Sequence, residues 1–247
     1  MGDFLSNFYA GVAATIVAGI VVWIVKLIQR YRRRSVGGAV AFSVARIVKW
    51  AWSVAFVGEI PPHAREIEGK ETKSRKVYDC LIDLGAVDVY SSRLLLSVRG
   101  LSDETVIIRD IRVDVEQSEA ISGTRISSPN AGANEATVLL FDLEDKSPVA
   151  KEWQENEDEV KTKPFFDSKN VTLARNEVHD IVIIGSAKRS LVMWRLYLDL
   201  EVAGKSQTIE IDENGKPFKT TGYPDGGFQW DLEWAWHDDN RFHQIVE

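Results

Sequence analysis

Strict alternation of apolar and polar residues constrains the fold of this chain more than any other feature. It is clearest in MWRLYLDLEV (193–202), where every second residue belongs to an apolar set: Trp194, Leu196, Leu198, Leu200 and Val202. Side chains on a β-strand point alternately to opposite faces, whereas a helix repeats its apolar positions every three or four residues. The segment therefore predicts a strand that buries one face.

Further strand patterns recur across residues 77–247. They are RLLLSVRG (93–100), DIRVDVE (110–116), ATVLLFDLE (136–144), VHDIVIIG (178–185) and FQWDLEWAWH (228–237). Turn residues separate them, and the strand–helix–strand order of a parallel sheet is missing. Residues 77–247 are therefore predicted to form a mainly β domain, an antiparallel β-sandwich of immunoglobulin-like or related type. One short helix is expected in KVYDCLIDLG (76–85), ended by Gly85.

The triplet Gly204-Lys205-Ser206 is how a phosphate-binding P-loop ends. Such a loop needs another glycine at position 199, where this chain has Asp199, and a helix after it, where the chain alternates again. A two-residue turn at Gly204-Lys205 explains the triplet better, with Leu200 opposite Ile209. The four histidines lack metal-ligand spacing. The sequence therefore predicts no cofactor, no metal and no enzyme, since only His237 beside two aspartates hints at catalysis.

An uncharged apolar segment, Phe4 to Val25, is long enough to cross a bilayer as a helix. Arg32, Arg33 and Arg34 follow it, which is the reverse of the charge order in a cleaved signal peptide. Residues 1–34 are therefore predicted to be a transmembrane anchor with a basic flank, its N-terminus outside and its arginines in the cytoplasm.

Small residues recur every four positions in that segment, at Ala10, Ala14 and Ala18. Small residues at this spacing let two spanning helices approach closely, although they are also common in spanning helices generally. They are therefore candidate packing positions for a homo-oligomer.

A second apolar stretch, Gly37 to Val57, contains two central charges, Arg46 and Lys49. Each charge would cost about 2.5–3.5 kcal/mol at a bilayer centre. Residues 35–60 are therefore predicted to be an interfacial amphipathic helix, with a second spanning helix as the alternative. The predicted headgroup contacts are Arg32, Arg33, Arg34, Arg46, Lys49, Trp50 and Trp52.

Charge is divided unevenly along the chain. Seven basic and two acidic residues precede position 61, so this part has a net charge of +5. The whole chain has a net charge of −7, so residues 61–247 carry −12. The acidic remainder argues against nucleic acid as a partner, and the basic start suits a lipid bilayer. Residues 61–76 are dense in mixed charge and are predicted to be a linker. Cys80 is the one cysteine, so an internal disulfide is excluded.

Three tryptophans lie close together in the last predicted strand, at positions Trp230, Trp234 and Trp236. Aromatic residues in this pattern are mostly buried, so the core is the favoured interpretation. If one face of the strand is open, they are candidate anchors for a protein partner.

Residues 194–222, WRLYLDLEVAGKSQTIEIDENGKPFKTTG, resemble the C-terminal segment of a family of actinobacterial proteins with a membrane segment and a β-rich domain. The shared features are the Trp-Arg-Leu strand, the glycine hairpin and the Gly-Lys-Pro-Phe-x-Thr-Thr-Gly end. The resemblance implies a β-rich fold and no particular activity.

Two functional hypotheses follow. The first is a membrane-tethered binding module at the cytoplasmic face of the cell membrane. The second is a membrane effector, whose domain senses a ligand and whose helices oligomerise to perturb or gate the bilayer.

Overall fold

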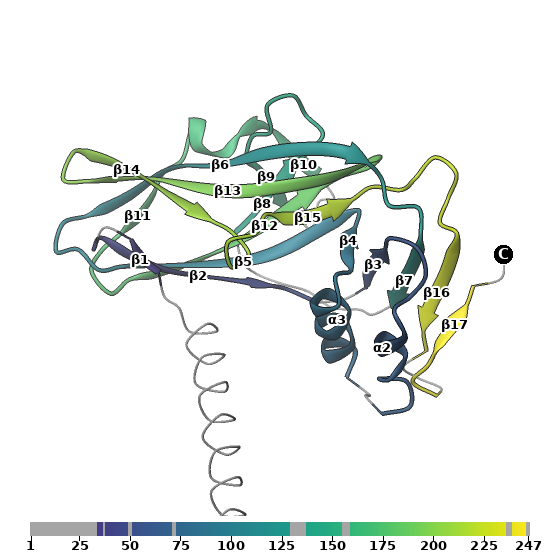
Figure 1. Cartoon of the computed structure of the whole chain (residues 1–247). Helices are drawn as coiled ribbons and strands as arrows, with labels where there is room; N and C mark the ends of the chain where they lie inside the picture. The colour runs from purple at the N-terminus through teal and green to yellow at the C-terminus, as the bar shows by residue number, and fades with distance from the viewer. Residues whose placement is uncertain are drawn as a thin grey trace, which may run out of the picture.

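The computed structural model describes residues 34–36, 38–48, 51–70, 73–128, 137–154, 159–235 and 239–245. The chain is mainly β, with two sheets and few helices (Figure 1). The predicted anchor, with Ala10, Ala14 and Ala18, lies outside the described residues. Within the described ranges, none of the helices has the length and apolar character needed to cross a membrane.

In the part of the chain that the structure describes, the first sheet contains seven strands. In spatial order they are β1 (Arg34–Val36), β2 (Val40–Arg46), β5 (Ser91–Gly100), β12 (Val178–Ser186), β8 (Thr137–Asp142), β9 (Lys151–Gln154) and β10 (Glu159–Pro164). The long strands β5 and β12 form its centre and pair antiparallel over nine residues.

The second sheet contains ten strands within the same described ranges. Nine of them are, in spatial order, β11 (Val171–Leu173), β6 (Val106–Glu119), β13 (Ser190–Val202), β15 (Phe218–Thr221), β4 (Val87–Val89), β3 (Trp52–Phe56), β7 (Thr124–Ser128), β16 (Trp230–Trp234) and β17 (Phe242–Gln244). The tenth, β14 (Lys205–Ile211), pairs with the same edge of β13 as β15 does. The prediction of antiparallel pairing needs correction, because β8 with β12, β4 with β15 and β7 with β16 are parallel.

One apolar core lies between the two sheets, which is compatible with the predicted β-sandwich. The predicted apolar face of β13 is confirmed, since Trp194, Leu196, Leu198 and Leu200 are all at most 1% exposed. They pack in the same cluster as Leu94 of β5 and other inward residues of the first sheet. Burial of such side chains is the main source of stability in a fold of this kind.

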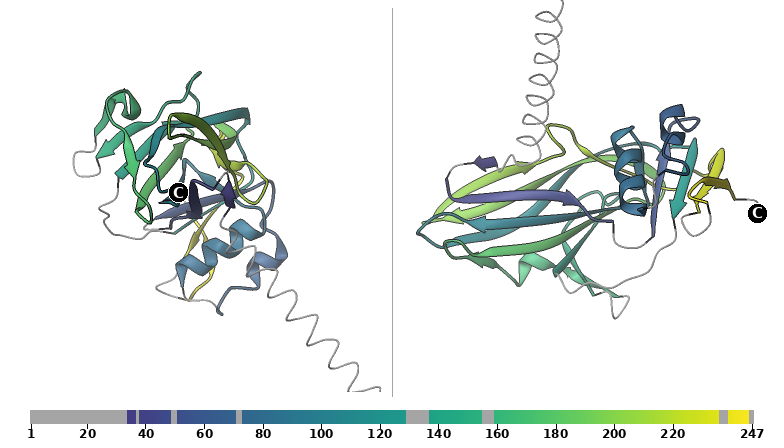
Figure 2. Two further views of the ribbon diagram at one scale, coloured as in Figure 1. Left: turned by 90° about the vertical axis from the view of Figure 1, so that its left-hand side faces the viewer. Right: turned by 90° about the horizontal axis from the view of Figure 1, so that it is seen from below.

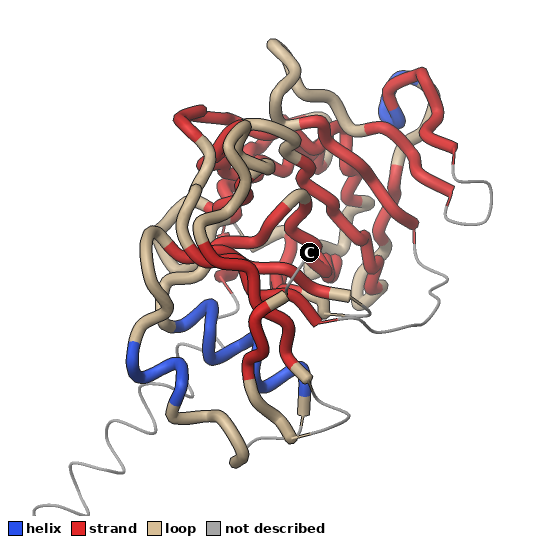
Figure 3. Tube along the Cα trace, turned by 90° about the vertical axis from the view of Figure 1, so that its right-hand side faces the viewer, coloured by secondary structure: helices blue, strands red, loops and turns tan. Residues whose placement is uncertain are grey.

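A second, smaller core lies where the helices pack against β3, β7, β16 and β17. The helices, α2 (Pro62–Arg65) and α3 (Ser74–Asp83), lie at one end of the long strands (Figures 2 and 3). The predicted short helix is confirmed as α3, which buries Val77 and Leu81, and Gly85 follows it with a φ of 98°. The predicted linker is instead partly folded, because α2 and the start of α3 fall within it and Ala64 is fully buried.

Residues 35–60 are not the predicted amphipathic helix, nor a second spanning helix. They contain β2 and β3, whose inward residues such as Val40, Phe42, Val54 and Phe56 are buried in the two cores. These positions also fit an alternation of two, and the backbone groups of both strands are paired with β5, β4 and β7. The apolar residues of this segment fit both the helical period and the strand period of two. Pairing with distant strands therefore decides which structure forms.

The predicted hairpin between β13 and β14 is present, but its turn comes one residue earlier. Ala203 and Gly204, not Gly204 and Lys205, form the turn, with φ values of 49° and 75°. Positive φ at both positions is the type I′ geometry, which matches the twist of paired strands. Ile209 consequently lies opposite Leu198 rather than Leu200, and the two-residue shift keeps the apolar residues on one face.

Candidate functional site

A buried ion-pair network surrounds Arg46. Arg46 ends β2 in the first sheet and donates from Nη1 to Asp88 of β4 in the second sheet. Its Nε and Nη2 donate to the two carboxylate oxygens of Glu213 at 2.7 and 3.0 Å. The side chains of Arg46 and Asp88 are only 11% and 6% exposed. The network therefore connects the two sheets through charge-assisted bonds.

Asp88 is surrounded by further donors. The Tyr78 hydroxyl of α3 donates to its Oδ1 at 2.7 Å, and the Ser92 hydroxyl of β5 donates to its Oδ2 at 2.6 Å. Ser92 continues to Thr220 at 2.8 Å, and the Trp194 indole donates to the same Thr220 hydroxyl at 3.1 Å. The buried carboxylate is thus satisfied entirely within the protein, as buried charges must be.

The protonation of this network follows from burial and neighbouring charge. Burial raises the pKa of Asp88, and Arg46, Ser92 and Tyr78 oppose that rise. Burial, together with the Asp88 carboxylate, raises the pKa of Tyr78 well above its ordinary range. Burial alone would lower the pKa of Arg46. Asp88 and Glu213 outweigh burial, so the pKa of Arg46 lies above its ordinary value. Arg46 and Tyr78 therefore keep their protons and act as hydrogen-bond donors.

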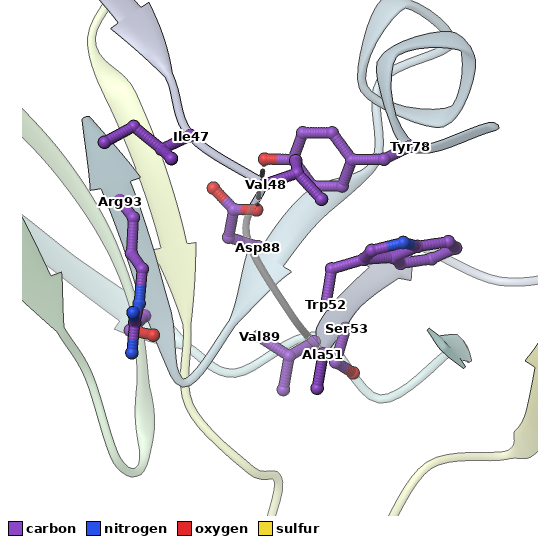
Figure 4. Close-up of a pocket in the computed structure, with 10 residues that line it drawn as sticks. Ile47, Val48, Ala51, Trp52, Ser53, Tyr78, Asp88, Val89 and Arg93 are labelled. Atoms are coloured by element: carbon purple, nitrogen blue, oxygen red, sulfur yellow. Dashed lines mark hydrogen bonds between the residues drawn. The ribbon is translucent and has the colours of Figure 1, made fainter. Parts of the chain in front are cut away.

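A cavity of about 190 Å³ lies beside Asp88 and Tyr78 (Figure 4). Its wall includes Trp52, Ser53 and Arg93, and the Ser53 hydroxyl is buried without a hydrogen-bond partner among the described residues. Arg93 lies over the Trp153 ring, with 5.5 Å from its guanidinium carbon to the ring centre. The cavity offers a hydroxyl and a cation, while both oxygens of Asp88 already accept hydrogen bonds from within the protein.

A groove of about 620 Å³ lies along β6. Every residue from Arg109 to Val115 lines it. The opposite wall is formed by residues 146–150, by Pro164, and by Phe166 and Asp167 of η1 (Phe165–Asp167). Consecutive strand residues point to opposite faces, so a groove lined by all of them runs along the edge of the strand.

The β6 edge is open because of a bulge. The strand β11 pairs with β6 only from Val106 to Ile108, and the register against β13 shifts directly afterwards, at Arg109. A bulge bends its strand and ends regular pairing. From Asp110 to Glu119, no strand of the described part of the chain pairs with this side of β6.

The backbone groups on the open edge can be assigned. The Ile111 amide donates at 2.8 Å to the side chain of Asp110, which places it on the side away from β13. Amides of an antiparallel strand alternate between its two edges, so those of Val113 and Val115 lie on the same open side. The side chains of Ile111 and Val113 point into the core, and the groove therefore exposes their backbone rather than an apolar face.

Several predicted site residues lie elsewhere than expected. Arg46 is a buried ion-pair residue and not a headgroup contact, because Asp88 and Glu213 hold its guanidinium within the fold. Trp52 is 6% exposed and donates to Ser74 Oγ at 2.6 Å, so it too lies within the domain and not at a lipid surface.

The favoured core interpretation holds for Trp234, which is fully buried against Phe242, so it is no anchor for a partner. Trp230 is partly exposed, and Arg34 belongs to β1. The remaining predicted residues, Arg32, Arg33, Lys49, Trp50 and Trp236, lie outside the described residues.

Asp88, Tyr78, Glu213 and the β6 edge do not stand out in the sequence as candidate site residues. One signal was present, since Asp88 stands between Val87 and Val89 in a short strand in which all three residues are buried. A buried acid in such a strand requires a partner, but its partner Arg46 precedes it by 42 residues. The groove has no local signal, because it depends on which strands pair.

Comparison with models of known protein families and with curated proteins found no match. The resemblance to actinobacterial proteins stays a prediction. Within the described ranges, no group of three or more histidine, cysteine, aspartate or glutamate side chains could hold a metal ion.

Proposed function

We propose that this chain is a membrane-tethered binding module that takes up an extended segment of a partner protein along the open edge of β6. The groove beside that edge is the observation that carries the proposal. An unpaired strand edge offers a row of backbone donors and acceptors, and an added strand satisfies them. The groove extends over seven residues of β6, about 20 Å at the usual rise per residue.

The interior of the domain supports binding over catalysis. The best-developed buried polar cluster, around Arg46 and Asp88, is held together by its own hydrogen bonds. Its position between the sheets suits a rigid scaffold, and a rigid edge lowers the entropic cost of ordering a partner strand.

The fold also sharpens the proposed topology. Since β2 and β3 belong to the folded domain, the segment 37–57 is not available as a second spanning helix. With Phe4 to Val25 as the anchor, the domain lies on the same side as Arg32, Arg33 and Arg34, which is the cytoplasm by the positive-inside rule. Labelling of Cys80 by a membrane-impermeant reagent in intact cells would contradict this placement.

Site-specific photo-crosslinking in the full-length chain tests the binding proposal. A photoreactive residue replaces Val149, which is 38% exposed on the groove wall. The matched control replaces Val178, which is 56% exposed at the start of β12. A protein adduct is expected from position 149 and not from position 178. Identical adducts from both positions would overturn the proposal.

A proline substitution sharpens this test. Val115→Pro removes a backbone amide on the open edge without removing a bond to β13, and Val115→Ala shortens the same side chain while keeping the amide. Proline should abolish the position-149 adduct and alanine should retain it, with both variants folded by near-UV circular dichroism. If Val115→Pro does not fold, Ser147→Trp fills the groove from the opposite wall and leaves position 149 free for the photoreactive residue.

A further inference from the structure

The charges around the β6 groove indicate what kind of segment fits it. On β6, Arg109 and Arg112 are already paired with acids of β13: Arg109 contacts Glu201 at 2.8 Å and Arg112 contacts Asp199 at 2.5 Å. Both β13 acids therefore neutralise cations that line the groove. What remains on the groove wall is an excess of negative charge.

Three carboxylates on the wall have no ion pair among the described residues: Asp110, Asp114 and Asp167. Among the described residues that line the groove, the one other cation is the exposed Lys146 on the opposite wall. Asp110 and Asp167 lie close enough for their charges to repel, which contributes to a raised pKa of Asp110 after the larger effect of burial. A cation placed between them would relieve that repulsion.

The two sides of an added strand would meet different surroundings. Its side chains alternate in the same way as those of β6. One set would lie beside the apolar wall formed by Pro148, Val149 and Phe166, and the other would lie on the outer face with Asp114. Phe166 is partly buried and packs against the main core, so this wall is fixed.

We infer that the β6 groove takes an extended segment in which apolar residues alternate with lysine or arginine. This inference rests on the proposed function, since it names the partner class for the same edge. Backbone pairing supplies the attachment, and the alternating basic side chains supply the selectivity through Asp110, Asp114 and Asp167.

Synthetic peptides test the inference directly. Three seven-residue peptides, alternating Val with Lys, with Ser or with Glu, are titrated against the full-length chain in zwitterionic detergent and followed by fluorescence anisotropy. The Lys peptide should bind at least about tenfold more tightly than the Glu peptide, because each exposed ion pair contributes a factor of about 1.5 to 5. The preference should shrink as salt is raised.

The triple variant Asp110→Asn, Asp114→Asn, Asp167→Asn identifies the source of selectivity. It should reduce the Lys-over-Glu preference to below about threefold and leave binding of the Ser peptide unchanged, since its backbone edge is intact. A matched control, Asp225→Asn, removes an exposed carboxylate of a distant turn and should preserve the preference.

The outcomes separate the two proposals. Equal affinity for the Lys and Glu peptides would overturn the basic-segment inference, while strand addition would stand if Val115→Pro abolished binding of both. Binding of the Lys peptide that survives Val115→Pro would show attraction to surface charge and overturn the inference. Failure of all three peptides, together with a position-149 adduct that Val115→Pro leaves intact, would overturn the proposed function itself.

Discussion

The Arg46 network and the β6 groove contain similar side chains and differ in whether the fold satisfies them. Around Arg46, both carboxylates and the guanidinium have partners inside the protein, and the pair with Asp88 is nearly removed from water. Along β6, the backbone edge and three carboxylates face a groove. The comparison indicates that the first region stabilises the contact between the sheets and that the second is available to a partner.

Breaking the Arg46 network should have the largest effect. Arg46→Met keeps the apolar stem of the side chain but leaves the Asp88 carboxylate buried without its cation. Loss of one partner of a buried pair lowers the free energy of unfolding by about 3–5 kcal/mol. Urea denaturation of the full-length chain, followed by tryptophan fluorescence, measures the change.

The second substitution of a double-mutant cycle shows whether charge is the cause. Asp88→Asn in the Arg46→Met background removes the unpaired charge, keeps an acceptor oxygen for the Tyr78 hydroxyl and turns an amide donor toward the Ser92 hydroxyl, which can accept. The double variant should recover at least about 1 kcal/mol of the loss. If Arg46→Met alone lowers the free energy of unfolding by less than about 1 kcal/mol, the Arg46–Asp88 pair is no stronger than an ordinary surface ion pair, and the contrast with the groove is lost.

A smaller effect is expected when one hydroxyl is removed from each region. Tyr78→Phe deletes the donor to Asp88 Oδ1 and should lower the free energy of unfolding by about 1.5–3 kcal/mol, the usual worth of a hydrogen bond to a charged group. Tyr197→Phe is the comparison in the open region, because the Tyr197 hydroxyl is bonded to Asp114 of the groove wall and Tyr197 is partly exposed, and it should change stability by less than about 0.5 kcal/mol. Equal losses in the two variants would contradict the distinction between a closed and an open region.

The part of the fold that could be predicted from the sequence is the part set by local alternation. The strands β5, β6, β12 and β13 and the helix α3 follow from the spacing of their own apolar residues. These patterns are long or are ended by a turn residue, and such signals depend on the segment itself.

The segment around Arg46 could not be predicted in this way. Its apolar residues fit both a helix and two short strands, and the two central charges suggested a lipid surface. The partners that explain Arg46 are Asp88 and Glu213, which are 42 and 167 residues away in the chain. The open edge of β6 likewise depends on β11 ending its pairing at Ile108, and pairing between distant strands leaves no local trace.

The smallest expected effect concerns the titration of Asp110 in the groove. Burial raises the pKa of Asp110, and Asp199 and Asp167 add to the rise, against the Ile111 amide and Arg112. The folded protein then holds this proton more tightly than the unfolded chain does. The contribution of Asp110 to the free energy of unfolding therefore falls as the pH rises from the unfolded value of about 3.9 through the folded pKa.

Asp110→Asn keeps the acceptor for the Ile111 amide and removes the titration. The variant should lose the downward step in stability across that pH window and gain no more than about 0.5 kcal/mol at pH 7. The carboxyl signal of Asp110 in a carbon-13 NMR titration gives the folded pKa directly, and a bound Lys–Val peptide should lower it because a nearby cation favours the carboxylate. A folded pKa at or below 3.9 in the free protein would mean that the groove does not hold Asp110 in a partly buried, repulsive setting.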